Sequence, residues 1–236
     1  FHAIGLPLAE LWGMSETCGS GTINRPDWIK LGTVGQASPG TELKLAEDGE
    51  LLMRSPSVFH RYRNAPDKTA EALDADGWLH TGDVAEIDDD GFVKLVDRKK
   101  ELIINAAGKN MSPSNIEGQL KSASPLIGSA VCIGDARSYN TALIVLDTDF
   151  APVWASQHGL EGRPMAEIAA DPTLHAEIEV AVERANAALS RVEQIKKFTI
   201  LGTEWLPGGD ELTPTMKLKR KPIGEKYAAE IEGMYS

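Results

Sequence analysis

The chain has 236 residues, 42% of them hydrophobic, and a formal net charge of −11 at pH 7. This length suits one or two domains with a packed core, and the acidic balance argues against generic nucleic-acid binding, which needs a basic surface. Two cysteines are too few for a disulfide framework or a zinc site, so a reducing, cytoplasmic location is expected. No apolar run approaches the roughly 20 residues of a membrane span.

The N-terminal stretch FHAIGLPLAELWG lacks the basic segment of a signal peptide. Its composition is typical of a helix that contains Pro7 and lies in the middle of a domain. Because the first residue is Phe1 and not Met, we expect the chain to be the C-terminal fragment of a longer protein.

Residues 33–97 are typical of short strands joined by turns. TELKLAEDGELLMRS, residues 41–55, alternates apolar and polar positions on both sides of an Asp-Gly pair, which predicts a β-hairpin. AEIDDDGFVKLVDR, residues 85–98, has the same pattern. Between the two hairpins, Pro66 is expected to begin a short helix.

From Lys99 onward the pattern changes to alternating helices and strands. Ser112 followed by Pro113 predicts the start of a helix, with the serine as its N-cap. Two strands are expected at 129–136 and 139–149, followed by a helical stretch at 164–195 that Asp171-Pro172 breaks. Another strand is expected at 196–202, and a last helix is expected to begin at about residue 224. This part is therefore expected to be a small α+β domain.

The stretch LWGMSETCG offers a candidate nucleotide site, although a capped turn would also account for it. Trp12 provides a ring face for a base, Gly13 allows close backbone approach, Ser15 can donate to a phosphate oxygen, and Glu16 is an oxygen ligand suited to Mg²⁺. A serine hydrolase with Ser15 as nucleophile is disfavoured because that motif needs G-x-S-x-G and Thr17 replaces the second glycine.

Two later stretches offer further nucleotide contacts. In DGWLHTGD, the carboxylate of Asp83 can accept hydrogen bonds from vicinal hydroxyls, or the residue is a simple turn or cap, and His80 is interpreted as packing. In DRKKELIINAAGKN, the planar guanidinium of Arg98 can reach a ribose or a phosphate. Lys109 is interpreted as a surface lysine, because GKN lacks the first glycine and the hydroxyl of a P-loop.

The segment ELTPTMKLKR, with the residue after it, gathers Lys217, Lys219, Arg220 and Lys221 behind a Thr-Pro-Thr turn. Such a cluster can be a solvated face, a phosphate-binding site or the surroundings of one catalytic lysine. The residues alone leave these three alternatives open.

Taken in order, LWGMSET, GELLMRS with DGWLHTGD, DRKKELII with NAAGKN, and LTPTMKLKR resemble the motifs of the adenylate-forming superfamily. That superfamily comprises acyl-CoA synthetases, luciferases and peptide-synthetase adenylation domains. TPTMKLKR and GKNMSPSNIE are most similar to long-chain fatty acyl-CoA synthetases. The resemblance covers essentially the whole chain. It implies an α+β fold, with the β-rich end of a large adenylation domain over 1–97, a small mobile C-terminal lid domain over 98–236, and a hinge near 97–101.

The resemblance also implies a role for each matching position in the first two motifs. Trp12 and Gly13 belong to the family's Y-G-x-T-E motif, in which the aromatic residue flanks adenine. Ser15 would contact the α-phosphate and Glu16 would hold Mg²⁺. Asp83 would hold the ribose hydroxyls.

The later motifs imply the remaining roles. Arg98 would also hold the ribose, and Lys100 falls at the hinge position. Gly108 matches the glycine that lines the pantetheine tunnel for CoA, and Lys217 matches the lysine that catalyses adenylation. Met216 stands where many members have glycine, while the other cationic residues of the cluster are interpreted as supporting or solvated charge.

The implied reaction joins a long-chain fatty acid to CoA in two steps, through acyl-AMP and with ATP and Mg²⁺. The family's phosphate-binding loop precedes the WGMSE region and has no counterpart in this chain, so we hypothesise that these 236 residues alone do not catalyse the full reaction and need the missing N-terminal half. The alternatives are a fatty acyl-AMP ligase that delivers to a carrier protein, and a non-catalytic interaction domain. The implied partners are a fatty acid, ATP and CoA, and a lipid substrate is compatible with peripheral association with a membrane.

Overall fold

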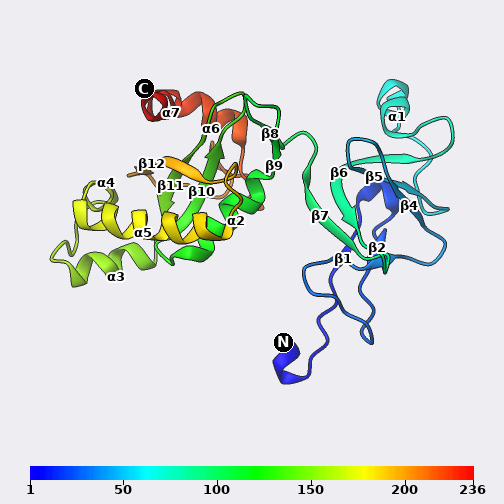
Figure 1. Ribbon diagram of the computed structural model, residues 1–236, viewed down its shortest axis with the longest axis horizontal. Helices are drawn as coiled ribbons and strands as arrows, with labels where there is room; N and C mark the ends of the chain where they lie inside the picture. The colour runs from blue at the N-terminus through cyan, green and yellow to red at the C-terminus, as the bar shows by residue number, and fades with distance from the viewer. The chain divides into compact units, whose positions relative to one another are not determined.

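The computed structural model describes all residues from Phe1 to Ser236, which form two compact units, Phe1–Glu101 and Leu102–Ser236 (Figure 1). They are called unit 1 and unit 2 below. Both contain helices and strands, so the predicted α+β class is confirmed. None of the helices combines the length and the apolarity that crossing a bilayer requires.

Unit 1 is built on a four-stranded antiparallel sheet in the order β4-β5-β6-β7. These strands span Glu42–Leu45, Glu50–Arg54, Leu79–Ile87 and Val93–Arg98. β4 pairs with β5 and β6 pairs with β7 around the two Asp-Gly turns, so both predicted hairpins are confirmed. Apolar side chains that alternate along β5 and β6 bury one face of the sheet, with Leu51, Met53 and Ala85 in its core.

The rest of unit 1 consists of short elements. The strands β1, β2 and β3 form a small sheet over Leu11–Trp12, Thr22–Ile23 and Gln36–Ala37, and helix α1 spans Pro66–Ala72 as predicted. The predicted N-terminal helix is wrong, because only the single 3-10 turn η1, His2–Ile4, forms. Gly5 ends that turn at a φ of 79°, and Pro7 disfavours helical backbone at the residue before it.

Unit 2 contains a three-stranded sheet in the order β10-β11-β12. The strands span Ile127–Ile133, Asn140–Leu146 and Ile195–Leu201. β10 runs antiparallel to β11, whereas β12 runs parallel to it, so the chain needs a crossover between them. That crossover contains α3, α4 and α5, at Phe150–Gln157, Met165–Ala169 and Pro172–Ala188.

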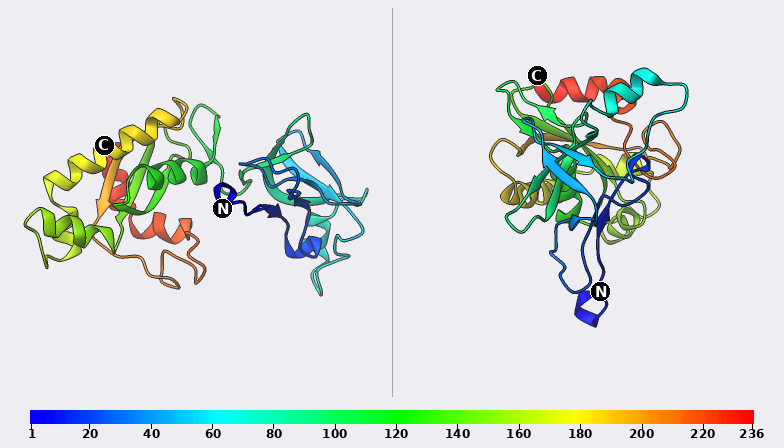
Figure 2. Two further views of the ribbon diagram at one scale, coloured as in Figure 1. Left: turned by 90° about the horizontal axis from the view of Figure 1, so that it is seen from below. Right: turned by 90° about the vertical axis from the view of Figure 1, so that its right-hand side faces the viewer.

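Helices cover both faces of this sheet (Figures 1 and 2). α2, Pro113–Ala123, packs with α5 on one face, and α6 and α7, Arg220–Lys226 and Ala228–Tyr235, pack on the other. β11 is buried along its whole length, because alternate side chains enter different cores: Ala142 and Ile144 face α2 and α5, and Leu143 faces α6 and α7.

Side-chain caps begin two of the helices in unit 2, α2 and α5. The Asn115 amide donates to Ser112 Oγ at 3.1 Å, and the Thr173 amide donates to Asp171 Oδ1 at 2.8 Å, so the predicted helix start and the predicted break are confirmed. The last helical region begins at Arg220, four residues before the expected Gly224. α3 has no counterpart in the sequence prediction.

Candidate active site

Three of the predicted nucleotide-binding residues meet in unit 1 around the carboxylate of Asp83. Asp83 lies on β6 directly opposite Arg98 of β7, and Arg98 Nε is 2.7 Å from Asp83 Oδ1. The indole Nε1 of Trp12, on β1, donates to Asp83 Oδ2 at 2.8 Å. Each carboxylate oxygen therefore has one fixed partner and retains capacity to accept a further hydrogen bond.

The carboxylate of Asp83 is buried, with 5% of the residue exposed. Burial raises its pKa, and the hydrogen bond from Trp12 and the charge of Arg98 offset this effect only in part, so the pKa lies above the ordinary value. A buried carboxylate gains from every added donor. A ligand with two vicinal hydroxyls would supply such donors.

The indole of Trp12 is itself a core side chain. The residue is 7% exposed and packs with Leu51, Met53 and Val93, which leaves little of its ring face for a base. Its contact with adenine therefore stays a prediction. The hydrogen bond to Asp83 crosses 71 positions of the chain, so no local pattern could have predicted it.

The phosphate and metal candidates lie on the 3-10 turn η2, Ser15–Thr17. Tyr62 OH donates to Glu16 Oε1 at 2.5 Å, and the Phe59 amide donates to the Glu16 carbonyl at 2.8 Å. The hydrogen bond to Glu16 raises the pKa of Tyr62 to about 12. Sequence reasoning missed Tyr62, whose contact with Glu16 spans 46 positions.

Gly13 is required by the chain's own backbone at this turn. A Cβ atom added there would lie 1.4 Å from the Gly19 carbonyl oxygen, so no other residue fits without a backbone shift. This close approach is a structural reason for the glycine, and contact with a nucleotide stays a prediction.

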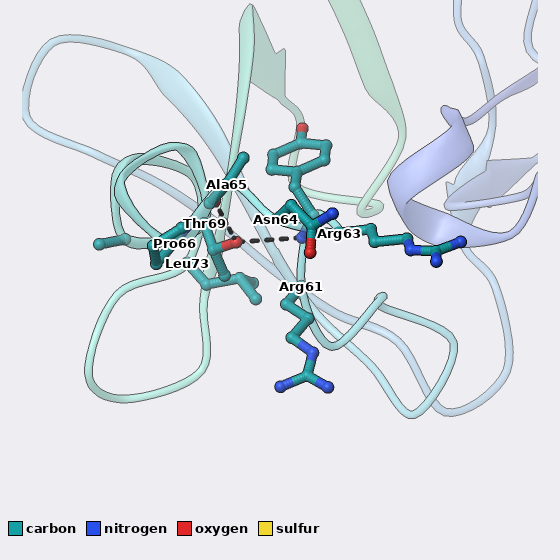
Figure 3. A pocket seen from close by; sticks show the side chains of 9 residues that line it. Arg61, Arg63, Asn64, Ala65, Pro66, Thr69 and Leu73 are labelled. Atoms are coloured by element: carbon teal, nitrogen blue, oxygen red, sulfur yellow. Dashed lines mark hydrogen bonds between the residues drawn. The ribbon is translucent and has the colours of Figure 1, made fainter.

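An open pocket of about 740 Å³ is lined by the segment 61–65 and by residues of α1 and its C-cap (Figure 3). Its wall includes Arg61, Asn64 and Thr69, and Thr69 Oγ1 accepts from the Tyr62 amide at 3.0 Å. This bond ties the start of α1 to the segment that carries the Tyr62 ring.

A single carboxylate is available for a metal at η2. No group of three or more His, Cys, Asp or Glu side chains gathers in the structure in a way that could hold a metal ion. Mg²⁺ commonly takes one or two protein carboxylates and completes its shell with water and substrate phosphates, so Glu16 fits that use. Ser15 is exposed, and no hydrogen bond joins its hydroxyl to a histidine, as a serine hydrolase would require.

A second buried carboxylate, Glu50, lies close to the end of unit 1. It accepts from Lys99 Nζ at 2.9 Å, from the Gly82 amide at 2.9 Å and from His80 Nδ1 at 3.2 Å. Burial alone would raise the pKa of Glu50, but these donors outweigh it and the pKa is lowered. Lys100, which follows Lys99 in the chain, is exposed. The role of Lys100 as a hinge stays a prediction.

In unit 2, Gly108 lies in the hairpin between β8 and β9, Ile103–Ile104 and Asn110–Met111. Its φ of 74° belongs to the left-handed region that favours glycine. Asn105 Oδ1 accepts from the Lys109 amide at 2.9 Å across this turn, and its tip is solvent-exposed.

Lys217 lies in a hairpin closed by a bridge between Leu212 and Leu218, here called the lysine hairpin (212–218). The Thr213 amide donates to the Lys217 carbonyl at 2.8 Å, and the Lys217 amide donates to Thr213 Oγ1 at 3.0 Å. Met216 has a φ of 63°, a left-handed conformation that glycine adopts more readily. The Lys217 side chain is exposed.

The neighbouring cationic side chains have different partners. Lys219 Nζ donates to the Gly209 carbonyl at 2.8 Å, and Arg220 forms a bidentate pair with the buried Glu117 at 2.6 and 2.9 Å. The side chain of Lys221 is 87% exposed. Two members of the basic cluster are therefore bound within unit 2, and Lys221 is solvated.

Residues 100–236 match the family model described as the AMP-binding enzyme C-terminal domain. The chain belongs to this family. The match covers the hairpins of both Gly108 and Lys217, and together with the relatives below it confirms the resemblance to the adenylate-forming superfamily.

Relatives of this AMP-binding family member align with its whole length. The protein of Mycobacterium tuberculosis named fatty-acid–CoA ligase fadD11 is 58% identical over 236 residues, which are 41% of its length. The long-chain-fatty-acid–CoA ligase FadD15 of Mycobacterium bovis is 44% identical, and 39% of its length is covered. The chain thus spans about two fifths of these relatives.

A solved structure of the same superfamily has a similar fold. O-succinylbenzoate coenzyme A synthetase from Bacillus subtilis, in complex with AMP, superposes with a TM-score of 0.69 at 25% identity. The alignment covers 93% of this chain and 41% of that one. The same enzyme in complex with ATP and magnesium ion gives a TM-score of 0.66.

Proposed function

We propose that the chain is the C-terminal portion of an ATP-dependent long-chain fatty acid–CoA ligase, called the complete ligase below. The observation that carries this proposal is the buried Asp83 carboxylate, held by Trp12 and Arg98, in a chain whose relatives at 58% and 44% identity are named fatty-acid–CoA ligases. Because the chain covers 41% of the first of these relatives, the activity belongs to the complete ligase.

In the first step, the fatty acid carboxylate attacks the α-phosphorus of ATP, forming acyl-AMP and releasing pyrophosphate. Asp83 and Arg98 hold the ribose hydroxyls of ATP, the part of the Trp12 ring that its core packing leaves accessible flanks the adenine, Gly13 allows close approach of the backbone to the nucleotide, and Ser15 contacts the α-phosphate. Glu16 would hold Mg²⁺, which neutralises phosphate charge when bound. These residues orient the nucleotide for in-line attack.

Lys217 acts in the same step. Negative charge grows on the bridging and equatorial oxygens of the α-phosphate as the carboxylate attacks, and an ammonium group beside them stabilises the transition state more than the ground state. The exposed lysine hairpin presents the Lys217 side chain to solvent within unit 2, where it is available for such a contact.

In the second step, the CoA thiol attacks the acyl-AMP carbonyl, forming the thioester and releasing AMP. Gly108 lines the path of the pantetheine arm. We propose that the residues before position 98 and those from 98 to 236 act as two domains, and that a hinge at 97–101, centred on Lys100, changes the surroundings of the acyl-AMP between the steps.

The test is product analysis with the complete ligase. A long-chain fatty acid with ATP, Mg²⁺ and CoA should give acyl-CoA, AMP and pyrophosphate, whereas the isolated chain of 236 residues should give none. If CoA is not used and a phosphopantetheinyl carrier protein accepts the acyl group, the enzyme is a fatty acyl-AMP ligase. Acyl-CoA synthesis by the isolated chain would refute the proposal that it needs the remainder of the protein.

A further inference from the structure

Unit 2 contains a buried charged network at the base of the lysine hairpin. Glu211 is 6% exposed, and its Oε1 accepts from Lys226 Nζ at 2.7 Å and from Tyr227 OH at 3.0 Å. Tyr227 OH in turn accepts from Trp205 Nε1 at 3.0 Å. Glu211 thus connects the start of the hairpin to the C-terminal end of α6 and to the segment after β12.

The backbone of the same residue joins the two ends of the hairpin. The Lys219 amide donates to the Glu211 carbonyl at 2.8 Å, and Lys219 Nζ donates to the Gly209 carbonyl at 2.8 Å. Glu211 therefore directly precedes Leu212, where the hairpin begins, and its carbonyl holds Lys219, which follows the end of the hairpin. The carboxylate of Glu211 ties the start of the hairpin to Lys226 and Tyr227, and its backbone carbonyl holds the end of the hairpin through Lys219.

The tip of the hairpin is exposed, so the hairpin is held to unit 2 at its base. Pro214, Thr215, Met216 and Lys217 are exposed, and a two-stranded hairpin alone is at best marginally stable in water. Met216 also has a left-handed backbone conformation, which disfavours residues other than glycine. The anchoring contacts are therefore concentrated at the base of the hairpin, where Leu212 packs in the core with α6 and α7.

Burying a carboxylate costs free energy unless well-placed donors replace its lost hydration. Burial alone would raise the pKa of Glu211, but the hydrogen bonds from Lys226 and Tyr227 outweigh it, and the pKa is lowered. Fully satisfied polar networks favour one geometry over others, because every alternative leaves a buried group unpaired. The network around Glu211 therefore restricts the direction in which the hairpin projects.

We propose that Glu211, acting through Lys226 and Tyr227, is a positioning residue that holds the lysine hairpin so that the Lys217 amine reaches the α-phosphate during adenylation. This inference rests on the proposed function of Lys217. Glu211 does not contact the reacting atoms, so its effect is confined to the step that uses Lys217. A displacement of about 1 Å at a catalytic group can reduce a rate about 100-fold.

The test uses Glu211→Gln and Tyr227→Phe in the complete ligase, because both changes preserve side-chain shape. Adenylation is measured by pyrophosphate–ATP exchange, and thioester formation is measured separately from supplied acyl-AMP and CoA. We expect kcat for adenylation to fall about 10-fold or more, the KM for ATP to change less than about 3-fold, and thioester formation to change less than about 2-fold.

Two controls separate the possible explanations. Ile178→Val lies in the core on the opposite face of the sheet and should leave the ratio of the two rates unchanged even where it lowers stability. Lys217→Ala should abolish adenylation. If Lys217→Ala leaves adenylation intact, the proposed function of the lysine fails, whereas a loss in Lys217→Ala without a loss in Glu211→Gln overturns only the positioning role.

Amide hydrogen exchange in the chain of 236 residues gives a readout that is independent of activity. Glu211→Gln should accelerate exchange at the Lys219 amide, which donates to the Glu211 carbonyl, and should leave exchange along β11 unchanged. Unchanged exchange at Lys219 would contradict the anchoring role, as would equal losses in both half-reactions, because equal losses indicate general destabilisation.

Discussion

The ion pair between Arg220 and Glu117 gives a quantitative test of how unit 2 is held together. Arg220 begins α6 and Glu117 lies on α2, so the pair joins helices that pack on opposite faces of the sheet. Glu117 Oε1 also accepts from the Cys132 amide of β10 at 2.8 Å. We consider Arg220→Met, which removes the charge and keeps most of the apolar stem.

The magnitude follows from what Arg220→Met leaves behind. The side chain of Glu117 is 8% exposed and that of Arg220 is 24% exposed, so the variant removes a bidentate charged partner from a buried carboxylate. Removing one partner of a buried pair costs about 3–5 kcal/mol. Because Arg220 is partly solvated, we expect the lower end, about 3 kcal/mol, which corresponds to a decrease in Tm of about 10 °C for a domain of this size.

The assay is denaturant unfolding of the chain, followed by far-UV circular dichroism, for Arg220→Met, Glu117→Gln and the double variant. The double variant should be more stable than Arg220→Met alone, because the neutral glutamine needs no counter-ion and can still accept from the Cys132 amide. Lys221→Met is the matched control, since that side chain is 87% exposed and should change stability by less than about 0.5 kcal/mol. Additive effects in the double variant would refute the reasoning, as would an Arg220→Met variant within about 0.5 kcal/mol of the wild type.

Three further predictions concern single positions. Met216→Gly should stabilise unit 2 by about 0.5 kcal/mol. Glycine removes the strain of a side chain at a left-handed φ, and this gain exceeds the additional backbone entropy that glycine loses on folding by about that amount. A lower denaturation midpoint would contradict this. Tyr62→Phe should remove one tyrosine from the phenolate absorbance that appears near pH 12 in a spectrophotometric titration, since Glu16 raises the pKa of Tyr62 to about 12. Because burial also raises the pKa of Tyr235, the test is the difference between the two curves, and a high-pH amplitude equal to that of the wild type would exclude the assignment. The folded-state pKa of Glu50 is lowered from 4.5, so the contribution of Glu50 to stability is present above that pH and is lost as pH falls below it. The difference in unfolding free energy between wild type and Glu50→Gln should therefore shrink on acidification. A difference that is independent of pH would contradict the ion pair with Lys99.

Much of the secondary structure could be predicted because local chemistry determines it. Asp-Gly pairs set the turns of both hairpins in unit 1, and Ser112 and Asp171 cap helices through hydrogen bonds two or three residues away. The predicted N-terminal helix does not form because Gly5 ends the turn in a left-handed conformation and Pro7 disfavours helical backbone at the residue before it. α3 has only eight residues and was missed, although Asp147 Oδ1 accepts from the Phe150 amide at its start at 3.0 Å.

The sequence predicts which residues belong to the candidate site, but it does not predict the contacts between them. Motif order identified Asp83 and Lys217, but it did not reveal that the Trp12 indole binds Asp83 or that Tyr62 binds Glu16. These contacts join residues that are far apart in the chain, and their geometry depends on strand register and core packing. Glu211 was missed for the same reason, since its partners are brought together by the packing of α6 against the sheet.

The proposed role of Lys217 as the adenylation lysine of a two-step ligase can be tested by separating the two steps. The most direct measurement is the parallel quantification of acyl-AMP and acyl-CoA by the complete ligase, with Lys217→Ala beside Lys221→Ala. We expect Lys217→Ala to lose acyl-AMP formation from fatty acid and ATP but to convert supplied acyl-AMP to acyl-CoA, whereas Lys221→Ala should be fully active in both steps. If both steps survive in Lys217→Ala, the basic cluster is a solvated surface and the assignment of the catalytic lysine is wrong.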